Sequence, residues 1–226
     1  MSVEIRRGTD RYLTRGDGYF TRHSFSFGGH YDAANVAFGP LVCHDDHRLR
    51  AGRGFEEHPH RDVEIVTWVL SGSLHHRDSE GHTAVVRPGE VQVLSAGSGV
   101  THEEIAGPEG QARFVQAWLT PDETGTPPAY SVTPVSLTPG ELTPVAQVGD
   151  RAALLVARLD AGDRVTLPDA PLQHVFVARG ALTRSSLAEP LADGDAFRIT
   201  RPQDEPGLRL QVTAAVPTEL MVWAFT

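Results

Sequence analysis

Short apolar runs broken by glycine and proline are the feature that most constrains the fold of this chain. Its 226 residues include 22 glycines and 16 prolines. Runs rich in valine, leucine, phenylalanine and tryptophan lie between them, at residues 63–70, 83–87, 91–94, 113–119, 154–159, 175–178, 208–213 and 220–225. Turn signals such as Arg87-Pro88-Gly89 separate the runs. Because no long stretch has helical periodicity, the sequence predicts an all-β chain of barrel or sandwich type.

The two halves of the chain resemble each other. Residues 69–74 are similar to residues 177–182, and residues 114–118 to residues 220–224, with a shift of 105 to 108 positions. The repeat predicts two similar β domains in tandem. We expect a first domain at residues 1–122, a linker rich in proline, glycine and threonine at 123–134, and a second domain at 135–226.

Composition excludes several classes of partner. The formal net charge of −9 and the absence of a long basic run argue against a nucleic-acid surface. No apolar run approaches the roughly 20 residues that span a bilayer, and the first residues lack the apolar core of a signal peptide. The single cysteine, Cys43, rules out an internal disulfide and fits a reducing cytosol. We therefore expect a cytoplasmic protein without nucleic-acid or membrane partners.

Two short clusters place potential metal ligands two residues apart. They are His58-Pro59-His60 and His102-Glu103-Glu104. On a β-strand such residues point to the same face, and a proline between them suits an edge strand. Two neighbouring strands of this kind would aim three imidazoles and a carboxylate at one point. The sequence therefore predicts a metal site without cysteine ligands.

Strand parity narrows the choice of carboxylate without settling it. Glu103 points away from His102, whereas Glu104 shares its face, and Glu64 shares parity with His58 and His60. Three imidazoles and one carboxylate suit iron, with manganese, nickel, copper or zinc as alternatives. Such a set leaves two positions of an octahedron open, which favours a reactive site over a closed structural zinc site.

The second domain lacks these ligands. The positions that correspond to the two histidine-containing clusters are occupied by Thr166, Pro168, Gly207 and Arg209. We therefore expect only the first domain to bind metal.

These residues also carry a family resemblance. Gly52, His58-x-His60, Glu64 and Gly72 are spaced as in the first motif of the cupin superfamily. The longer strings at residues 23–28, 58–70, 76–79, 87–92 and 95–104 resemble the pirin family. The resemblance implies two tandem cupin-type β-barrels, a bicupin, in which the N-terminal barrel binds metal and the C-terminal barrel is degenerate. It also implies that Glu104 is the fourth ligand beside His58, His60 and His102, and that Glu64 supports the site or belongs to the core.

The same resemblance implies a function. Some pirin-like proteins are quercetin 2,3-dioxygenases, so we expect an iron-dependent (Fe²⁺/Fe³⁺) dioxygenase that cleaves a flavonol such as quercetin with O₂. A carboxylate would take the flavonol hydroxyl proton, with Glu104, Glu103 and Glu64 as candidates. The alternative is a regulatory protein whose metal or redox state controls binding to a protein partner, a transcription factor or a metabolic enzyme.

The sequence also predicts the environment of several other residues. His76 either lines the site, supports a ligand or stabilises a turn. Residues 43–46 (Cys-His-Asp-Asp) read as a solvated loop, with Cys43 as a small buried residue. Core positions are expected for four aromatic residues, Phe25, Phe27, Trp68 and Trp118.

Overall fold

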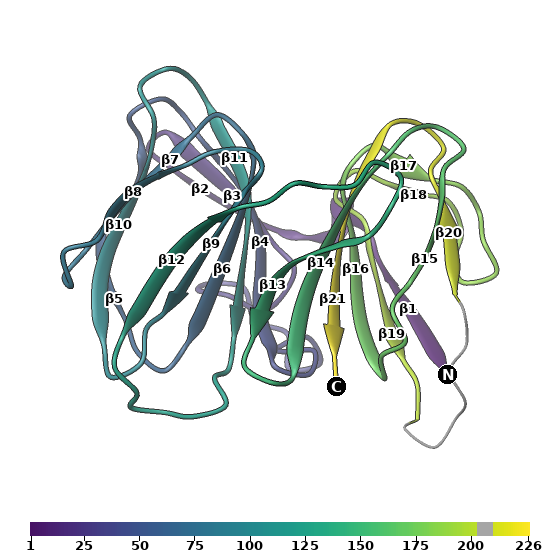
Figure 1. Cartoon of the computed structure of the whole chain (residues 1–226), viewed down its shortest axis with the longest axis horizontal. Helices are drawn as coiled ribbons and strands as arrows, with labels where there is room; N and C mark the ends of the chain where they lie inside the picture. The colour runs from purple at the N-terminus through teal and green to yellow at the C-terminus, as the bar shows by residue number, and fades with distance from the viewer. Residues whose placement is uncertain (203–209) are drawn as a thin grey trace. The chain divides into compact units, whose positions relative to one another are not determined.

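The computed structural model describes residues 1–202 and 210–226. Apart from one short 3-10 helix, η1 (Gly8–Asp10), its regular structure there is β-strand (Figure 1). The strands form two compact units, residues 12–135 and residues 1–11 together with 136–226. The predictions of an all-β chain and of a tandem repeat are confirmed. Two of the second-domain positions compared above, Gly207 and Arg209, and part of the expected strand at 208–213 lie outside the described residues. In the described part of the chain, no helix is long and apolar enough to cross a membrane.

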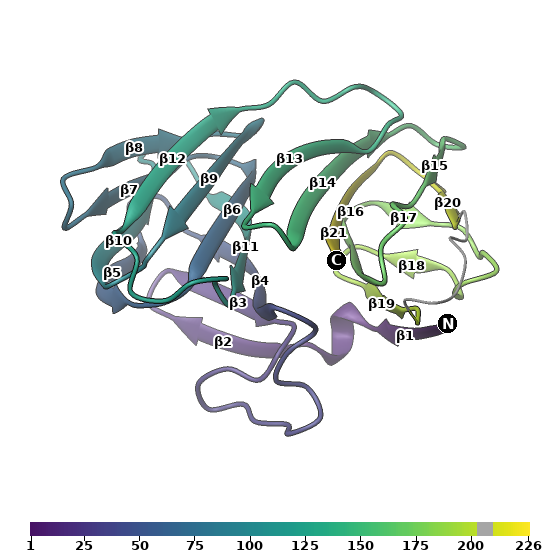
Figure 2. The same cartoon turned by 60° about the horizontal axis from the view of Figure 1, so that its bottom comes forward.

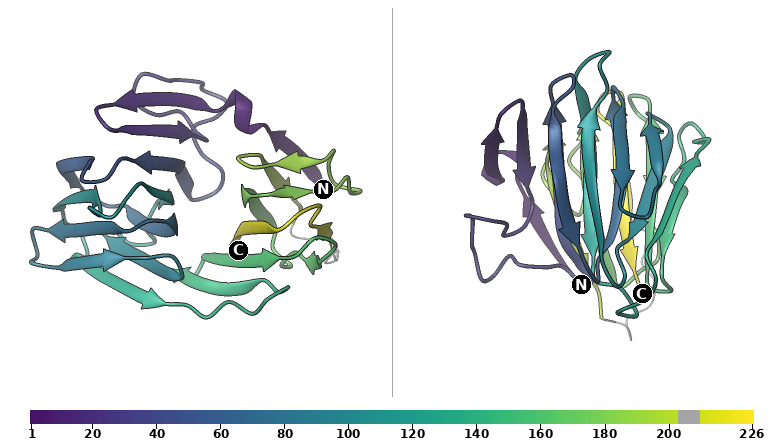
Figure 3. Two further views of the ribbon diagram at one scale, coloured as in Figure 1. Left: turned by 90° about the horizontal axis from the view of Figure 1, so that it is seen from above. Right: turned by 90° about the vertical axis from the view of Figure 1, so that its left-hand side faces the viewer.

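The first unit is a sandwich of two antiparallel sheets, one of the two architectures, barrel or sandwich, that the sequence predicted. One sheet has seven strands in the order β12-β9-β6-β11-β4-β3-β2, and the other has four in the order β5-β10-β7-β8. Figure 3 shows the ribbon from above and from the side. The seven strands are β2 (Tyr12–Gly16), β3 (Tyr19–His23), β4 (Leu41–Leu49), β6 (Glu64–Ser71), β9 (Glu90–Ser95), β11 (Ala112–Leu119) and β12 (Ala129–Pro134). The four strands are β5 (Gly54–His60), β7 (Leu74–Asp78), β8 (Thr83–Val86) and β10 (Val100–Ala106).

Apolar side chains from both sheets fill one end of the space between them. Val69 and Phe114 of the larger sheet pack with Leu74, Val86 and Ala106 of the smaller one. Burying a side chain of this size stabilises the fold by roughly 1.5–3 kcal/mol. Alternate residues of β10 are buried, from Val100 to Ala106, so the even-numbered positions of this strand point into the sandwich.

The second unit contains a six-stranded sheet in the order β1-β19-β16-β21-β14-β13 and two two-stranded ribbons, β15-β20 and β17-β18. The strands of the sheet are β1 (Ser2–Arg6), β13 (Thr143–Val148), β14 (Ala152–Leu159), β16 (Leu172–Arg179), β19 (Ala196–Thr200) and β21 (Thr218–Phe225). The strands of the ribbons are β15 (Arg164–Thr166), β17 (Ala181–Leu182), β18 (Leu191–Ala192) and β20 (Gln211–Thr213). The order β19-β16-β21-β14 repeats the order β9-β6-β11-β4 of the first unit.

A pair of turn glycines shows the repeat at the level of single residues. Gly72 and Gly180 both have positive φ, 73° and 83°. A Cβ at Gly72 would lie 2.4 Å from the carbonyl oxygen of Gln111, and one at Gly180 would lie 2.3 Å from that of Pro217. Only glycine fits both the backbone angle and the close approach. Each glycine therefore lets the chain leave a central strand of the large sheet, β6 or β16, at the same point of the fold.

The expected domain boundaries need correction at both ends of the first domain. Residues 1–11 belong to the second unit, because β1 pairs with β19 from Ser2 opposite Thr200 to Arg6 opposite Ala196 (Figure 2). The expected linker contains β12, which pairs with β9 as an edge strand. Composition cannot separate a linker from such a strand, since proline is tolerated at a sheet edge.

Candidate metal centre

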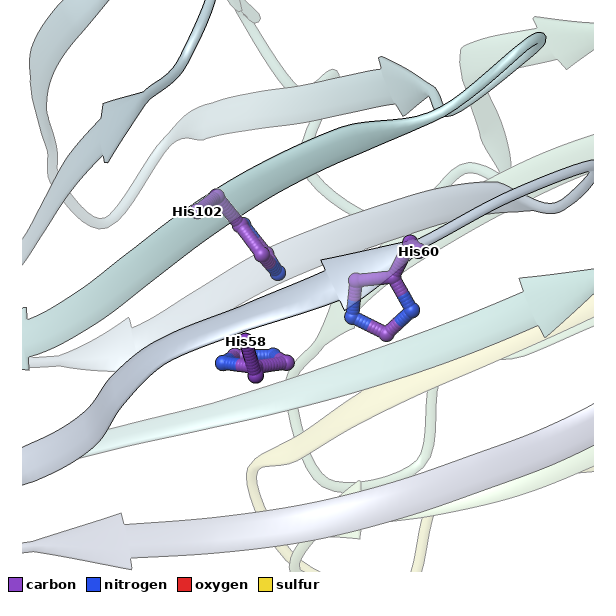
Figure 4. Close-up of side chains that lie close together, drawn as sticks. All are labelled: His58, His60 and His102. Atoms are coloured by element: carbon purple, nitrogen blue, oxygen red, sulfur yellow. The ribbon is translucent and has the colours of Figure 1, made fainter.

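Three histidines from two neighbouring strands of the smaller sheet lie together inside the first unit (Figure 4). In the β5–β10 register His58 lies opposite His102, and His60 lies opposite Val100. The ring centroids of His58 and His102 are 4.5 Å apart, and His60 is 4.9 Å from each of them. One nitrogen from each ring lies within 4.8 Å of the others.

The local sequence explains how β5 presents its two histidines. The strand is at the edge of its sheet, and Pro59 is exposed between two half-buried histidines. A proline there interrupts no ladder hydrogen bond that the sheet needs. Gly54 allows β5 to approach β10 closely, because a Cβ at this position would lie 2.1 Å from the carbonyl oxygen of Glu104.

The hydrogen bonds of these histidines leave nitrogen lone pairs free for a metal. His58 Nδ1 donates to the carbonyl oxygen of Glu56 at 2.7 Å, which leaves the lone pair on its Nε2. The Nε2 atoms of His60 and His102 are buried and have no hydrogen-bond partner among the described residues. Buried polar atoms are almost always satisfied, so three converging imidazoles of this kind fit a metal ion.

Burial also keeps two of the rings neutral. Desolvation, followed by the charges of neighbouring histidines, lowers the pKa of His60 to about 4. Desolvation likewise lowers the pKa of His102 to about 4, although Glu104 opposes the shift. Neutral imidazole is the form that binds metal, so both rings are ready to act as ligands at neutral pH.

Glu104 lies two residues after His102 on the same face of β10 and is 1% exposed. Its two carboxylate oxygens accept hydrogen bonds from amides of the opposite sheet, Gln92 Nε2 at 2.9 Å and Gln116 Nε2 at 2.8 Å. Burial raises the pKa of this carboxyl, but the electrostatic interaction with His102 and the hydrogen bonds from the two amides outweigh burial and lower it. The carboxylate is therefore held as an anion, and an oxygen of it lies within 4.8 Å of ligand nitrogens of His102 and His76.

The two glutamines are themselves held in one orientation. The Tyr130 hydroxyl donates to Gln92 Oε1 at 2.9 Å, and Trp118 Nε1 donates to Gln116 Oε1 at 3.0 Å. Both amide oxygens thus face donors, and both amide NH₂ groups face Glu104. The roles of these glutamines were not predicted from the sequence, although a polar residue inside an apolar strand is a signal that a buried partner exists.

The structure separates the other two carboxylates from the histidines. Glu103 points out of the sandwich, where Arg77 Nε lies 3.0 Å from its Oε1. Glu64 begins β6 in the larger sheet and accepts a hydrogen bond from Ser95 Oγ. Alternation along β6 places Glu64 on the face opposite to Thr67, whose hydroxyl accepts hydrogen bonds from Gln92 and Gln116 inside the sandwich.

The expectation that Glu64 could act as a ligand or base is corrected accordingly. The parity argument assumed that one regular strand continues from His60 to Glu64. The chain instead turns at Asp62, a non-glycine residue with φ of 49°, and passes into the other sheet. A turn resets the alternation of faces, so parity cannot be carried across it.

His76 supports the centre from the neighbouring strand β7. It is 2% exposed, and its Nε2 lies 3.1 Å from Asp78 Oδ2. Its Nδ1 lies 3.5 Å from His102 Nδ1, and its ring stacks on Tyr130 at 4.2 Å. With Asp78 accepting from Nε2, His76 Nδ1 is left to accept from His102, which directs the lone pair of His102 Nε2 toward His58 and His60.

Two weaker expectations are wrong. Residues 43–46 are not a solvated loop: they form the middle of β4 and are buried, and Asp46 receives two hydrogen bonds from Arg113 at 3.0 and 2.8 Å. Phe27 was expected in the core but is exposed and lines a cavity. Trp118 packs against the core, as expected, and also lines this cavity, with its ring centroid 5.5 Å from that of Phe27. The expectations of burial for Phe25, Trp68 and Cys43 are confirmed.

The cavity beside the histidines has a volume of about 560 Å³. His58, Glu104 and Gln116 form its metal-centre wall. Aromatic side chains line it as well, Tyr19, Phe27, Phe55 and Trp118. A cavity of this size, apolar with a few convergent polar groups, suits a small organic ligand.

Comparisons with known proteins agree with the fold. The pirin family model matches residues 6–119. A Mycobacterium tuberculosis protein named "Putative quercetin 2,3-dioxygenase" is 43% identical over 98% of this chain and 94% of its own length. The Escherichia coli K12 protein named quercetin 2,3-dioxygenase is 39% identical over 57% of this chain and 56% of its own length. The crystal structure of the bacterial pirin YhhW from Escherichia coli in complex with nickel(II) superposes with a TM-score of 0.86, at 25% identity and with 98% of each chain covered. The chain belongs to the pirin family.

Proposed function

We propose that this protein is a metal-dependent dioxygenase that cleaves a flavonol such as quercetin, with iron as its metal. The observation that carries the proposal is the convergence of three imidazoles beside a cavity of about 560 Å³. His58, His60 and His102 would hold the metal through nitrogen, and Glu104 would supply the carboxylate. Relatives named as quercetin 2,3-dioxygenases and the nickel complex of a bacterial pirin support this assignment.

The donor set supports iron or a similar transition metal. Neutral imidazole and carboxylate ligands suit iron, nickel, copper, zinc and manganese, and the absence of thiolate disfavours a closed structural zinc site. When bound, such an ion would supply Lewis acidity toward the flavonol oxygens and a site for dioxygen. The two amides on Glu104 would keep its carboxylate charged and fixed in place.

The cavity walls supply binding and orientation. Phe27 and Trp118 present aromatic surfaces in an edge-to-face arrangement, with their ring planes 75° apart. A planar flavonol ring system would pack against such surfaces and displace water from the centre. Binding there would bring the oxygenated edge of the substrate to the wall that contains His58 and Glu104.

Turnover of quercetin by metal-loaded protein tests the proposal. Protein loaded separately with iron(II), nickel(II) and manganese(II) is mixed with quercetin in air, and the flavonol absorbance and dissolved oxygen are followed together. We expect both to fall in at least the iron form. The control is the His58→Ala/His60→Ala variant treated in the same way. Turnover by this variant at the rate of the unaltered protein, or no turnover by any loaded form, would refute the assignment.

A further inference from the structure

A hydrogen-bonded chain of three side chains, two of which line the same cavity, lies on the strands β2, β3 and β4. His23 Nδ1 lies 2.6 Å from Asp45 Oδ2, and His23 Nε2 lies 2.9 Å from Thr14 Oγ1. His23 and Asp45 are each 3% exposed, whereas Thr14 is half-buried. Thr14 and His23 are both among the residues that line the cavity, as are His58 and Glu104.

The partners of His23 fix the direction of these hydrogen bonds. A carboxylate only accepts, so His23 Nδ1 carries the proton that is donated to Asp45. His23 Nε2 then has a lone pair and accepts from the Thr14 hydroxyl. The ring cannot easily rotate away, because Phe27 stacks on it with centroids 4.9 Å apart and planes 12° apart. The arrangement is that of a base oriented by a carboxylate, with a hydroxyl between the base and the cavity.

The reaction proposed above needs a proton acceptor in the cavity. A flavonol hydroxyl that binds a metal as its anion must transfer its proton to another group. Each oxygen of Glu104 already accepts an amide hydrogen bond, and Glu104 is also assigned to the metal, so a proton on this carboxylate would compete with the metal for it. Glu103 and Glu64 point away from the cavity. Thr14 and His23 line the cavity, and His23, held by Asp45, has an accepting nitrogen.

We propose that Thr14, His23 and Asp45 form a proton relay that deprotonates a phenolic substrate bound in the cavity, an inference that rests on the proposed function. The substrate O–H donates its proton to Thr14 Oγ1 as the Thr14 hydroxyl proton passes to His23 Nε2. Thr14 ends neutral, the substrate becomes a phenolate, and His23 becomes an imidazolium beside the Asp45 carboxylate. Thr14 contacts the substrate, His23 accepts the proton, and Asp45 is a positioning residue.

Substitution of Thr14 tests the relay with little disturbance of the fold. Thr14→Val keeps the shape and removes the hydroxyl, and Thr14→Ser restores it. Iron-loaded variants are compared for metal content and for kcat/KM toward quercetin. We expect full metal content in both, a loss of kcat/KM on the order of 100-fold in Thr14→Val, and near-normal turnover in Thr14→Ser. Thr83→Val, at an exposed position of β8, is the matched control and should leave kcat/KM unchanged.

The pH profile distinguishes a relay from a structural role. Protonated His23 cannot accept a proton, so kcat/KM of the unaltered enzyme should fall on the acid side. This limb should flatten in His23→Asn, whose amide can still donate to Asp45. Other titratable groups near His23 include Asp45 itself and His30, whose ring centroid is 6.2 Å away. The cavity that His23 lines is also lined by Asp17, Tyr19, Arg53, Glu56, His58 and Glu104. The titratable groups on the flanking strands include Tyr12 of β2 and Asp46 and His47 of β4.

The outcomes separate failure of the relay from failure of the function. An unaltered enzyme that turns over quercetin, with a Thr14→Val variant of equal kcat/KM and an unchanged acid limb, would overturn the relay alone. An unaltered enzyme without turnover would overturn the dioxygenase assignment, and the relay with it. Loss in Thr14→Val with rescue in Thr14→Ser and a flattened limb in His23→Asn would support the relay.

Discussion

Replacement of Glu104 by glutamine should remove the metal and also destabilise the metal-free protein. The first effect follows from the loss of the carboxylate ligand, and the second from the two amides that donate to the carboxylate. An amide at position 104 offers one oxygen and one NH₂ group where the carboxylate offered two acceptors. One of the two glutamines, Gln92 or Gln116, must then face a second donor. Neither can rotate to avoid this, because Tyr130 and Trp118 donate to their oxygens.

The expected losses of stability and of metal affinity can be estimated from these hydrogen bonds and from the lost ligand. A buried donor left without an acceptor costs about 1–3 kcal/mol, so the free energy of unfolding of metal-free Glu104→Gln should fall by about that amount. Metal affinity should fall by at least about 100-fold, since removal of groups that only support a metal ligand already costs 10–100-fold. The double variant Glu104→Gln/Gln116→Glu restores complementary donors and acceptors. Its stability should recover while its metal affinity stays low.

Urea unfolding of the metal-free proteins and elemental analysis after loading and dialysis measure the two effects. Glu64→Gln is the matched control, because Glu64 lies on the opposite face of the other sheet and should affect neither quantity as strongly. Equal metal content in Glu104→Gln and Glu64→Gln would refute the reasoning about the ligand. Full stability in Glu104→Gln, or no recovery in the double variant, would refute the reasoning about the amides.

Three further predictions concern pH, strand spacing and metal removal. Because burial lowers the pKa of His60 and His102 to about 4, the unfolded chain binds more protons than the folded chain between that value and about pH 6.5. The free energy of unfolding of the metal-free protein should therefore fall as pH falls through this window. The dependence of this free energy on pH should be weaker in His60→Gln/His102→Gln, and urea unfolding at a series of pH values measures both. Gly54→Ala should push β5 away from β10 and lower metal content and stability, whereas Gly29→Ala, with open space around it, should change neither. Chelation should lower the free energy of unfolding, by about 2.7 kcal/mol relative to metal at 100 times its Kd, and equal unfolding curves with and without chelator would contradict metal binding by the folded state.

The ligand-bearing strands were predictable because their geometry is local. Alternation along a strand places His58 and His60 on one face, and Pro59 indicates an edge strand. That His58 lies opposite His102 depends in addition on the register in which β5 pairs with β10. Alternation along a strand cannot be used where the chain turns from one sheet into the other. For this reason strand parity left Glu64 as an alternative to Glu104 for the carboxylate ligand. Local patterns also could not predict the pairing of β1, because its partner β19 lies almost the whole length of the chain away.

The contacts between the two sheets of the sandwich could not be predicted from patterns within single strands either. Thr67, Gln92 and Gln116 lie on three adjacent strands and are aligned in register, with Thr67 opposite both glutamines. No spacing within one strand reveals that their polar groups meet, or that they meet Glu104 of the other sheet. Each appears in the sequence only as a polar residue in an apolar run. Together they form the surface on which an anionic ligand can be buried.

The second unit shows what this polar surface contributes. The positions that correspond to Thr67, Gln92 and Gln116 in its large sheet are Val175, Phe197 and Val222, which are aligned in the same register. All three belong to the apolar core of that unit. A carboxylate facing them would lose its hydration without gaining hydrogen bonds, at a cost of several kcal/mol. The second unit therefore differs from the first in more than its missing histidines. The environment that stabilises a charged ligand has been replaced by apolar packing, so restoring the ligands alone would not restore a metal site.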